Sequence, residues 1–352
     1  MRVLVVGPSS TRSKGGMATV IKEIENDEHL RLFYDLDSFE SYIDGGKINR
    51  LLFSVYSYLK FTLTKKNYDI YHIHAASRGS TFRKGYYVQK AKKWGKKVIL
   101  HIHGAQYMEF YNECNAKKKE KLISILKDAD LVIALSKEWK NKFDETFGLT
   151  NCVVLENGIN TEVLRPAITP SEVHQKSFVT LGRLGQRKGT YDLIDAVDIA
   201  KTVVPEIKVY LAGDGEVDQI KALVSKRNLQ KNIEVVGWIN SDGKRELLKR
   251  VSTVILASYN EGLPMSILEG MACGKAIIST MVGAIPEVVS RNNGILIEAG
   301  DVQALANAII KCALDKNIMN DMAQNNIAKI KNNFSMTIMH EKLANYYHEV
   351  LD

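Results

Sequence analysis

Short runs of apolar and β-branched residues alternate with segments of helical periodicity along the whole chain. In the first half this pattern predicts strands at residues 2–6, 30–35, 69–74, 97–103, 131–135 and 152–155. In the second half it predicts strands at residues 178–181, 208–212, 233–236, 253–257, 276–279 and 295–297. Strands that alternate with helices in this way are typical of parallel sheets built from strand-helix-strand units. We therefore expect the α/β class, with two doubly wound parallel sheets.

Two prolines, Pro166 and Pro170, interrupt both periodicities and mark the predicted join between two domains. A chain of 352 residues is also longer than a typical domain with a single hydrophobic core, and its length suits two domains. We place the first domain at residues 1–167 and the second at 168–335. Residues 336–352 have the pattern of an amphipathic terminal helix.

The formal net charge of +8 is confined to the first half of the chain. Residues 1–166 hold 27 Lys and Arg against 19 Asp and Glu, and residues 167–352 hold 21 against 21. A basic first domain attracts phosphates, whether on lipid, on nucleic acid or on a pyrophosphate-linked acceptor. Few aromatic residues accompany these lysines and no nucleic-acid-binding motif appears, so nucleic acid is the least favoured of the three.

Cysteine usage and the N-terminus favour a cytoplasmic protein. The four cysteines are scattered without a C-x2-C pair, which argues against a zinc site and a disulfide framework. The chain enters a strand at Arg2, so we expect no signal peptide. Residues 51–63 are too short to span a bilayer and read as a mostly apolar helix with flanking lysines. It could lie on an anionic membrane surface, but a packed helix with solvated ends is the favoured interpretation of this segment.

The loop after the predicted strand 253–257 carries the most specific chemistry in the chain. Glu261 and Glu269 stand on either side of the start of an apolar-periodic helix, with Pro264 near its first turn. A helix start offers backbone N–H groups and the positive end of the helix dipole to an anion or a hydroxyl-rich ligand. Gly262 and Leu263 would present such amides, and the two glutamates would accept hydrogen bonds from hydroxyls. Helix capping and solubility are the alternative explanation.

The loop after strand 178–181 places Arg183 and Lys188 among glycines. Two cations at the carboxyl end of a strand suit a diphosphate, because arginine binds it through two N–H groups and lysine adds a point charge. Gly15 and Gly16 precede a helix in the first half and allow close approach of a ligand. Gly213 and Trp238 follow two further strands of the second half.

Four histidines end two neighbouring strands of the first half: His72, His74, His101 and His103. Strand alternation puts each pair on one face. A metal cluster is one interpretation, but no acidic or cysteine ligand stands at suitable spacing, so buried hydrogen-bonded histidines are expected. Arg78 and Lys84 follow the first of these strands and could face an anionic acceptor, but we expect them to be solvated basic residues.

These motifs together resemble the retaining GT-B glycosyltransferases of family 4. The segment from Glu261 to Glu269 resembles their EX7E signature, and residues 182–189 resemble their G-R-L-x-x-x-K-G motif. His103 with Gly104 matches the H-G position of the family, and residues 157–159 resemble its N-G-I/V-D loop. Asn160 stands where aspartate is usual there. The motifs occur in the family's order over nearly the whole chain.

The resemblance implies two Rossmann-like domains that face each other across a cleft. Residues 336–352 would cross back to the first, acceptor-binding domain, and the second would bind a nucleotide-sugar donor. His103, Glu261, Arg183 and Lys188 are the implied catalytic residues. The implied donor contacts are Gly15, Gly16, Arg183, Lys188, Gly213, Trp238, Glu261, Gly262, Leu263, Pro264 and Glu269. Arg78 and Lys84 are the implied acceptor contacts.

The implied reaction is hexosyl transfer with retention of configuration, from a UDP-sugar rather than a GDP-sugar. Fixed cations and helix dipoles would neutralise the leaving diphosphate, so we expect no metal and no cofactor. The acceptor would be a glycan or a lipid-pyrophosphate-linked molecule of cell-surface polysaccharide synthesis, handled in the cytoplasm or on the inner face of the membrane. Two alternatives stay open, namely an epimerase or soluble synthase of the same fold, and a non-catalytic nucleotide-sugar-binding module.

Overall fold

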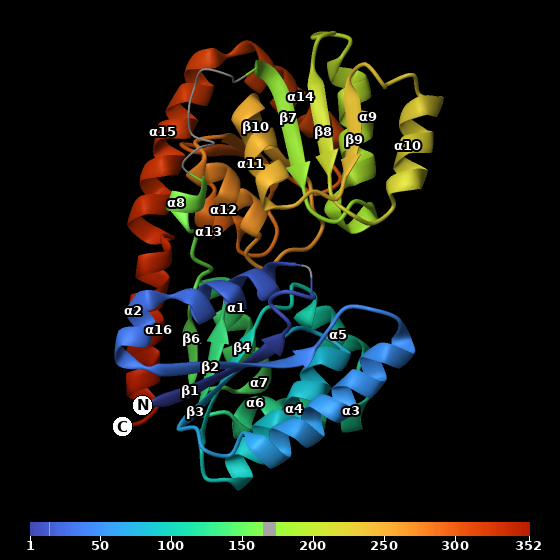
Figure 1. Cartoon of the computed structure of the whole chain (residues 1–352). Coiled ribbons are helices and arrows are strands. Elements are labelled where there is room, and N and C mark those ends of the chain that lie inside the picture. Colours follow the sequence, from blue (N-terminus) through green and yellow to red (C-terminus); the bar gives the residue numbers. More distant parts are fainter. Residues whose placement is uncertain (14, 165–173) are drawn as a thin grey trace. The chain divides into compact units, whose positions relative to one another are not determined.

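A computed structural model describes residues 1–13, 15–164 and 174–352. Its internal contacts divide the chain into two compact units (Figure 1). Unit 1 consists of Met1–Gly158 and Thr337–Asp352, and unit 2 consists of Ile159–Met336. The units therefore divide after Gly158, whereas the predicted join at residues 165–170 lies outside the described residues.

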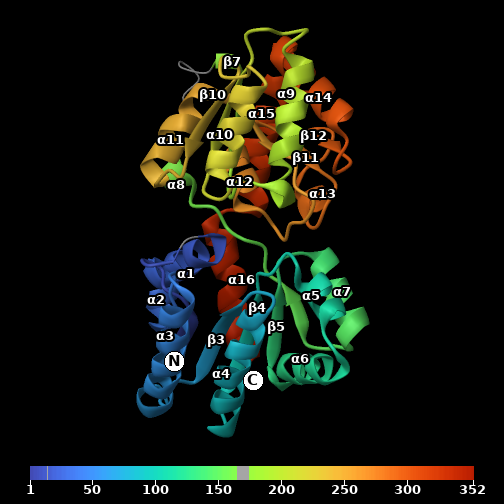
Figure 2. The ribbon, with the colours of Figure 1, turned by 90° about the vertical axis from the view of Figure 1, so that its right-hand side faces the viewer.

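Unit 1 is built on a six-stranded parallel sheet with the order β2-β1-β3-β4-β5-β6. Its strands are β1 (Arg2–Pro8), β2 (Asp35–Tyr42), β3 (Ile70–Ala75), β4 (Lys97–Ile102), β5 (Leu131–Ala134) and β6 (Cys152–Val154). Its helices are α1 (Gly16–Asn26), α2 (Glu28–Phe33), α3 (Lys47–Thr64), α4 (Gly79–Lys93), α5 (Tyr107–Glu113), α6 (Ala116–Asp128), α7 (Lys137–Phe147) and α16 (Met336–Glu349). Helices flank this sheet on both sides (Figure 2).

Unit 2 has a second six-stranded parallel sheet, with the order β12-β11-β10-β7-β8-β9. Its strands are β7 (His174–Leu181), β8 (Lys208–Ala212), β9 (Ile233–Gly237), β10 (Val251–Leu256), β11 (Ala276–Thr280) and β12 (Gly294–Ile297). Its helices are α8 (Thr161–Leu164), α9 (Thr190–Ala200), α10 (Val217–Lys226), α11 (Ser241–Arg250), α12 (Met265–Ala272), α13 (Ile285–Val288), α14 (Val302–Leu314) and α15 (Lys316–Asn333).

Each unit has its own hydrophobic core. Strands β3 and β10 are buried at every position, as expected of central strands covered on both faces. In both sheets the order reverses between the first strand of the unit and the strands that follow, which creates a switch point at the carboxyl ends of the strands. The predicted α/β class with two doubly wound parallel sheets is confirmed.

One predicted strand is wrong. Residues 30–35 were expected to form a strand, but Glu28–Phe33 form helix α2 and the strand begins at Asp35. The Asp27 carboxylate caps the helix by accepting a hydrogen bond from the amide of Leu30 at 2.6 Å. Residues 30–33 thus belong to a helix that turns only Leu30 of this short apolar run into the core.

The terminal helix α16 packs into unit 1 through both polar and apolar contacts. Tyr34 donates a hydrogen bond to the carbonyl of Ala344 at 2.9 Å, and Tyr346 donates to the carbonyl of Val154 at 2.8 Å. Tyr347 is fully buried. The helix therefore contributes side chains to the core of unit 1, although it lies almost 200 residues from β6 in sequence.

Candidate functional site

Backbone hydrogen bonds join the three loops that follow β7, β8 and β9 in unit 2. The amide of Leu184 donates to the carbonyl of Asp214 at 2.7 Å, and the amide of Gly213 donates to the carbonyl of Gly237 at 2.8 Å. A Cβ atom at Gly213 would lie 1.7 Å from the carbonyl oxygen of Gly182, so only glycine permits this approach. The carboxyl edge of the sheet is therefore a fixed platform of glycine-containing loops.

Arg183 stands on this platform with its side chain 71% exposed. Its guanidinium lies 3.7 Å from the carboxylate of Asp214, a long ion pair at the surface. Exposed pairs of this kind contribute little to stability. The N–H groups of Arg183 can therefore turn to a ligand oxygen at low cost.

Lys188 and Glu261 form the most buried ion pair at this edge. The ammonium of Lys188 lies 2.5 Å from Oε1 of Glu261, and the two side chains are 16% and 7% exposed. The hydroxyl of Ser258 donates to the same Oε1 at 2.6 Å, and its carbonyl accepts from Thr280 at 2.6 Å. The structure thus brings together two residues that the sequence assigned separately to diphosphate and sugar.

The loop from β10 to α12 is held from two sides. Arg187 donates to the carbonyl of Asn260 at 2.9 Å, and the amide of Ala284 donates to the carbonyl of Gly262 at 3.0 Å. Gly283 has a positive φ of 53°, and a Cβ atom there would lie 2.0 Å from the carbonyl oxygen of Glu261. The position of Glu261 is therefore set by backbone packing as well as by Lys188.

Helix α12 begins at Met265, directly after Pro264, which is its N-cap residue. Leu263 is buried, with 5% of its surface exposed. The predicted start of a helix at this point is confirmed. Binding of a ligand by Gly262, Leu263 and Pro264 stays a prediction.

Glu269, on α12, forms an ion pair that the sequence did not reveal. Its Oε1 lies 2.6 Å from the ammonium of Lys244 on α11, and both side chains are largely buried. One carboxylate oxygen remains to accept from a ligand hydroxyl, since Lys244 bonds to the other. Trp238, at the end of β9, leaves 54% of its surface exposed, which suits a stacking contact with a nucleotide base.

In unit 1, Gly15 and Gly16 form the start of helix α1. Gly15 is the N-cap residue with a φ of 113°, a conformation that favours glycine, and Gly16 is the first helical residue. The carbonyl of Gly15 accepts from the amide of Ala18 at 3.1 Å. The turn has the geometry of an ordinary helix start, and its contact with the donor stays a prediction.

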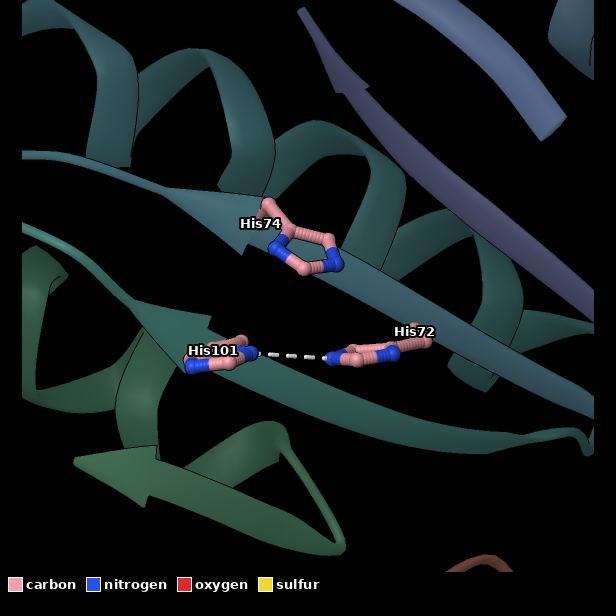
Figure 3. Close-up of side chains that lie close together, drawn as sticks. All are labelled: His72, His74 and His101. Atoms are coloured by element: carbon pink, nitrogen blue, oxygen red, sulfur yellow. Dashed lines mark hydrogen bonds between the residues drawn. The ribbon is translucent and has the colours of Figure 1, made fainter. Parts of the chain in front are cut away.

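The histidines at the ends of β3 and β4 form two hydrogen-bonded pairs, and Figure 3 draws three of the four, His72, His74 and His101. Nδ1 of His74 lies 2.8 Å from Nε2 of His103, and Nε2 of His72 lies 3.2 Å from Nδ1 of His101. Nδ1 of His72 also contacts the hydroxyl of Tyr347 at 2.8 Å. The expectation of hydrogen-bonded histidines is confirmed, and α16 supplies a partner that the sequence did not indicate.

Burial keeps these imidazoles neutral. It lowers the pKa of His72 and of His103 to about 3, and it lowers the pKa of His74 and of His101 well below 6.5. Nε2 of His74 is buried without a hydrogen-bond partner. An unpaired acceptor costs less there than an unpaired N–H, so we assign the proton of His74 to Nδ1. His74 then donates to His103, whose own proton lies on Nδ1.

Ring nitrogens of His72, His74 and His101 lie within 4.8 Å of one another, a spacing that could hold a metal ion. Three neutral imidazoles are a ligand set that zinc uses, but His72 and His101 bond to each other in the structure (Figure 3). The expectation of no metal stays a prediction.

Arg78 and Lys84 differ in their surroundings. Arg78 is exposed and forms an ion pair with Glu113 at 3.1 Å, which agrees with a solvated basic residue. Lys84 is buried in α4 and donates to the hydroxyl of Ser41, so the expectation of a solvated lysine there is wrong. Burial lowers the pKa of Lys84 to about 7. A role in acceptor binding stays a prediction for both residues.

Family models match both halves of the chain. Residues 28–163 match the model described as Glycosyltransferase Family 4, and residues 165–329 match the model described as Glycosyl transferases group 1. The chain belongs to the family 4, group 1 glycosyltransferases. The resemblance inferred from the motifs is confirmed at this level.

Curated relatives of this glycosyltransferase include a galactosyltransferase of Escherichia coli, UDP-Gal:alpha-D-GlcNAc-diphosphoundecaprenol alpha-1,3-galactosyltransferase. It is 28% identical over 319 residues, which are 84% of this chain and 78% of the relative. The putative glycosyltransferase EpsD of Bacillus subtilis is 25% identical over 315 residues, 85% of this chain and 81% of the relative.

Solved structures of the GT-B fold resemble the glycosyltransferase over nearly its whole length. HepE from Anabaena, in complex with UDP and glucose, has a TM-score of 0.77 at 20% identity and covers 99% of both chains. Sucrose-phosphate synthase from Thermosynechococcus elongatus has a TM-score of 0.81 at 17% identity, over 99% of this chain and 98% of that one. At these identities the likeness shows the fold, and it confirms the GT-B class.

Proposed function

We propose that this glycosyltransferase moves a hexosyl unit from a UDP-sugar to a lipid-pyrophosphate-linked acceptor, with retention of configuration. The observation that carries the proposal is the set of Arg183, Lys188, Glu261 and Glu269 at the carboxyl edge of the unit 2 sheet. The Escherichia coli relative supports it, because its name gives a UDP-sugar donor, a diphosphoundecaprenol acceptor and an alpha linkage.

Each donor residue has a role that its surroundings support. Arg183 would bind the diphosphate with its exposed guanidinium, and Lys188 would share its ammonium between Glu261 and a phosphate oxygen, since an ammonium has three N–H donors. Glu261 would accept from hydroxyls of the sugar and Glu269 from the ribose. Gly213 and Trp238 would meet the nucleotide, the tryptophan by stacking on the base.

The chemistry proposed for the transfer uses fixed charge rather than a bound metal. Two cations and the start of α12 would stabilise the leaving diphosphate. His103, neutral because burial lowers the pKa of its imidazole, would donate a hydrogen bond from Nδ1 toward the transferring sugar. The departing phosphate would take the acceptor proton. The bond from the anomeric carbon of the sugar to the phosphate would break, and the acceptor oxygen would bond to that carbon on the same face of the sugar ring.

We propose that the product enters a cell-surface polysaccharide and that the enzyme works at the inner face of the membrane. Similar proteins that are named for polysaccharide biosynthesis support this proposal. One is the amylovoran biosynthesis glycosyltransferase AmsK of Erwinia amylovora, which is 23% identical over 291 residues. The alternative of a non-catalytic binding module is not favoured by the family match.

The test is a transfer assay with a UDP-hexose and a polyprenyl-diphosphate-linked sugar, in the presence of a metal chelator. The proposal expects one glycosylated lipid whose new linkage has the anomeric configuration of the donor, as read by NMR of the released glycan. Production of the opposite anomer overturns retention. Loss of activity with chelator and its recovery with a divalent cation overturn the metal-independent route. Conversion of the UDP-hexose without acceptor points to an epimerase.

A further inference from the structure

The outward face of α3 is apolar although it is exposed to solvent. The apolar side chains on this face are between 54% and 81% exposed, and we call them the α3 stripe: Ile48, Leu51, Leu52, Val55, Tyr56, Leu59 and Leu63. At about 100° per residue their positions fall within an arc of about 140° on the helix. The stripe is therefore one continuous apolar surface rather than a scatter of single residues.

The inward face shows that this orientation is fixed by packing. Phe61 is fully buried and stacks on Trp94 at 5.4 Å between ring centroids. The hydroxyl of Ser57, also buried, donates to the carbonyl of Glu40 at 2.7 Å. The helix thus buries a serine and exposes four leucines, the reverse of the usual arrangement for a surface helix.

Between Asp44 and Asp69 the chain carries positive charges only. Residues 45–68 include no aspartate or glutamate, and they contain the cations Lys47, Arg50, Lys60, Lys65 and Lys66. Lys47 and Lys60 flank the stripe on the helix, and Lys65 and Lys66 follow its end. Helix α4 lies beside α3 and adds Lys90 and Lys93 in its last turn, whereas its Lys92 pairs with Asp130 (Figure 1).

We propose that the α3 stripe docks on an anionic lipid bilayer, with α3 lying in the plane of the interface. The apolar side chains would enter the boundary between headgroups and acyl chains, and the flanking cations would meet lipid phosphates. Among the described residues no helix is long and apolar enough to cross a membrane, so α3 would lie on the surface. The proposal rests on the proposed function, whose lipid-linked acceptor gives the enzyme a reason to reach the bilayer.

Charge decides between this occupant and a second copy of the chain. In a dimer paired through the stripe, the cations of the two copies would face each other and repel. Residues 45–68 offer no acidic side chain to compensate them. An anionic bilayer satisfies the apolar and the basic groups at once.

The test is co-flotation of the full-length protein with vesicles of phosphatidylcholine, with and without phosphatidylglycerol, at low and high salt. The stripe variant is Leu52→Glu with Leu59→Glu, and its matched control is Val203→Glu with Leu314→Glu, two equally exposed apolar positions in unit 2. A charge variant combines Lys60→Gln, Lys65→Gln and Lys66→Gln. Titration with UDP and size-exclusion chromatography are run on every protein.

We expect wild type and the control to bind anionic vesicles, and the stripe variant to bind at least about tenfold more weakly. The charge variant should lose the dependence on phosphatidylglycerol and on salt. Equal binding by wild type and the stripe variant overturns the proposal, as does a wild-type dimer that the stripe substitutions dissociate. UDP binding and the transfer assay test the proposed function separately from vesicle binding. The stripe variant should bind UDP as wild type does, so loss of vesicle binding alone concerns the α3 stripe, and loss of UDP binding or transfer by wild type concerns the proposed function.

Discussion

The ammonium of Lys188 lies 2.5 Å from Oε1 of Glu261, and the pair is almost completely buried at the carboxyl edge of the unit 2 sheet. Each charge therefore depends on the other for compensation, since a lone charge at this burial is costly. The ion pair and a hydrogen bond from Ser258 to the same oxygen together hold Glu261 in one orientation. A ligand that binds here meets two groups already held in place.

Glu261→Gln keeps the shape of the side chain and removes its charge. We expect kcat/KM to fall by roughly 10- to 150-fold, the equivalent of one hydrogen bond to a charged group. Steady-state kinetics with the UDP-sugar measure it. Glu206→Gln is the control, since Glu206 also pairs with a lysine but at the exposed surface. An unchanged kcat/KM in Glu261→Gln contradicts the assignment of Glu261.

Lys244→Met leaves Glu269 without its partner on α11. We expect donor affinity to weaken by about three- to tenfold, because the carboxylate loses the ion pair that orients it toward the ribose. Calorimetric titration with UDP measures the change. Lys249→Met on the same helix removes the pair with the exposed Glu246 and should leave the affinity as it is. Equal affinities of the two variants would show that Lys244 does not position Glu269.

Gly283→Ala adds a Cβ atom 2.0 Å from the carbonyl oxygen of Glu261, at a positive φ. We expect a loss of about 1–3 kcal/mol in the free energy of unfolding and weaker UDP binding, because the loop that carries Glu261 must move. Urea unfolding and calorimetry measure the two effects. Gly95→Ala is matched for positive φ but meets no atom within 4 Å. A loss of stability no larger than that of Gly95→Ala would argue against the backbone contact.

The histidine group predicts a pH dependence of stability. Burial lowers the pKa of each imidazole in the folded state, to about 3 for His72 and His103, from an ordinary value of 6.5. Below pH 6.5 the unfolded chain therefore binds more protons than the folded one. The contribution to stability is full above pH 6.5 and is lost as the pH falls toward 3.

His101→Gln removes one of these imidazoles. Burial lowers the pKa of His101 as well. The dependence of the free energy of unfolding on pH should become shallower by up to about 1.4 kcal/mol per pH unit between pH 4 and 6. Urea unfolding on a Trp238→Phe background measures it, since the remaining tryptophans, Trp94 and Trp139, report on unit 1. His348→Gln, at an exposed position, is the control.

His74→Leu tests the hydrogen bond of 2.8 Å between His74 and His103. We expect kcat to fall by about tenfold or more while UDP binding is retained, because the donor residues of unit 2 are untouched. The 15N shifts of His103 should change from protonation on Nδ1 to a mixture of tautomers. Unchanged shifts would contradict the assigned tautomer, whatever the effect on kcat.

The sequence predicted the elements whose signals are local. Strand β8 was predicted to the residue, and the loop with Glu261 was predicted to open a helix. Helix α2 was missed because a short apolar run fits either a strand or a helix. Asp27 followed by Glu28 is typical of the start of a helix, and this pair could have decided between strand and helix.

The partners of the site residues could not be predicted in the same way. Lys244 and Glu269 lie on different helices, and Tyr347 reaches His72 from the other end of the chain. Such contacts depend on how helices pack on the sheet, which no local pattern records. The residue types of the site were therefore predictable, whereas the ion pairs and hydrogen bonds that orient them came from the fold.

The most direct test of the donor site is a calorimetric titration with UDP, GDP and ADP in the presence of a metal chelator. It is run on wild type, on Arg183→Ala and on the control Arg227→Ala, which removes another arginine of unit 2 that pairs with an aspartate. We expect UDP to bind wild type and the control equally, and to bind Arg183→Ala roughly tenfold more weakly or worse. No binding of any nucleotide to wild type, or equal binding to all three proteins, would contradict it.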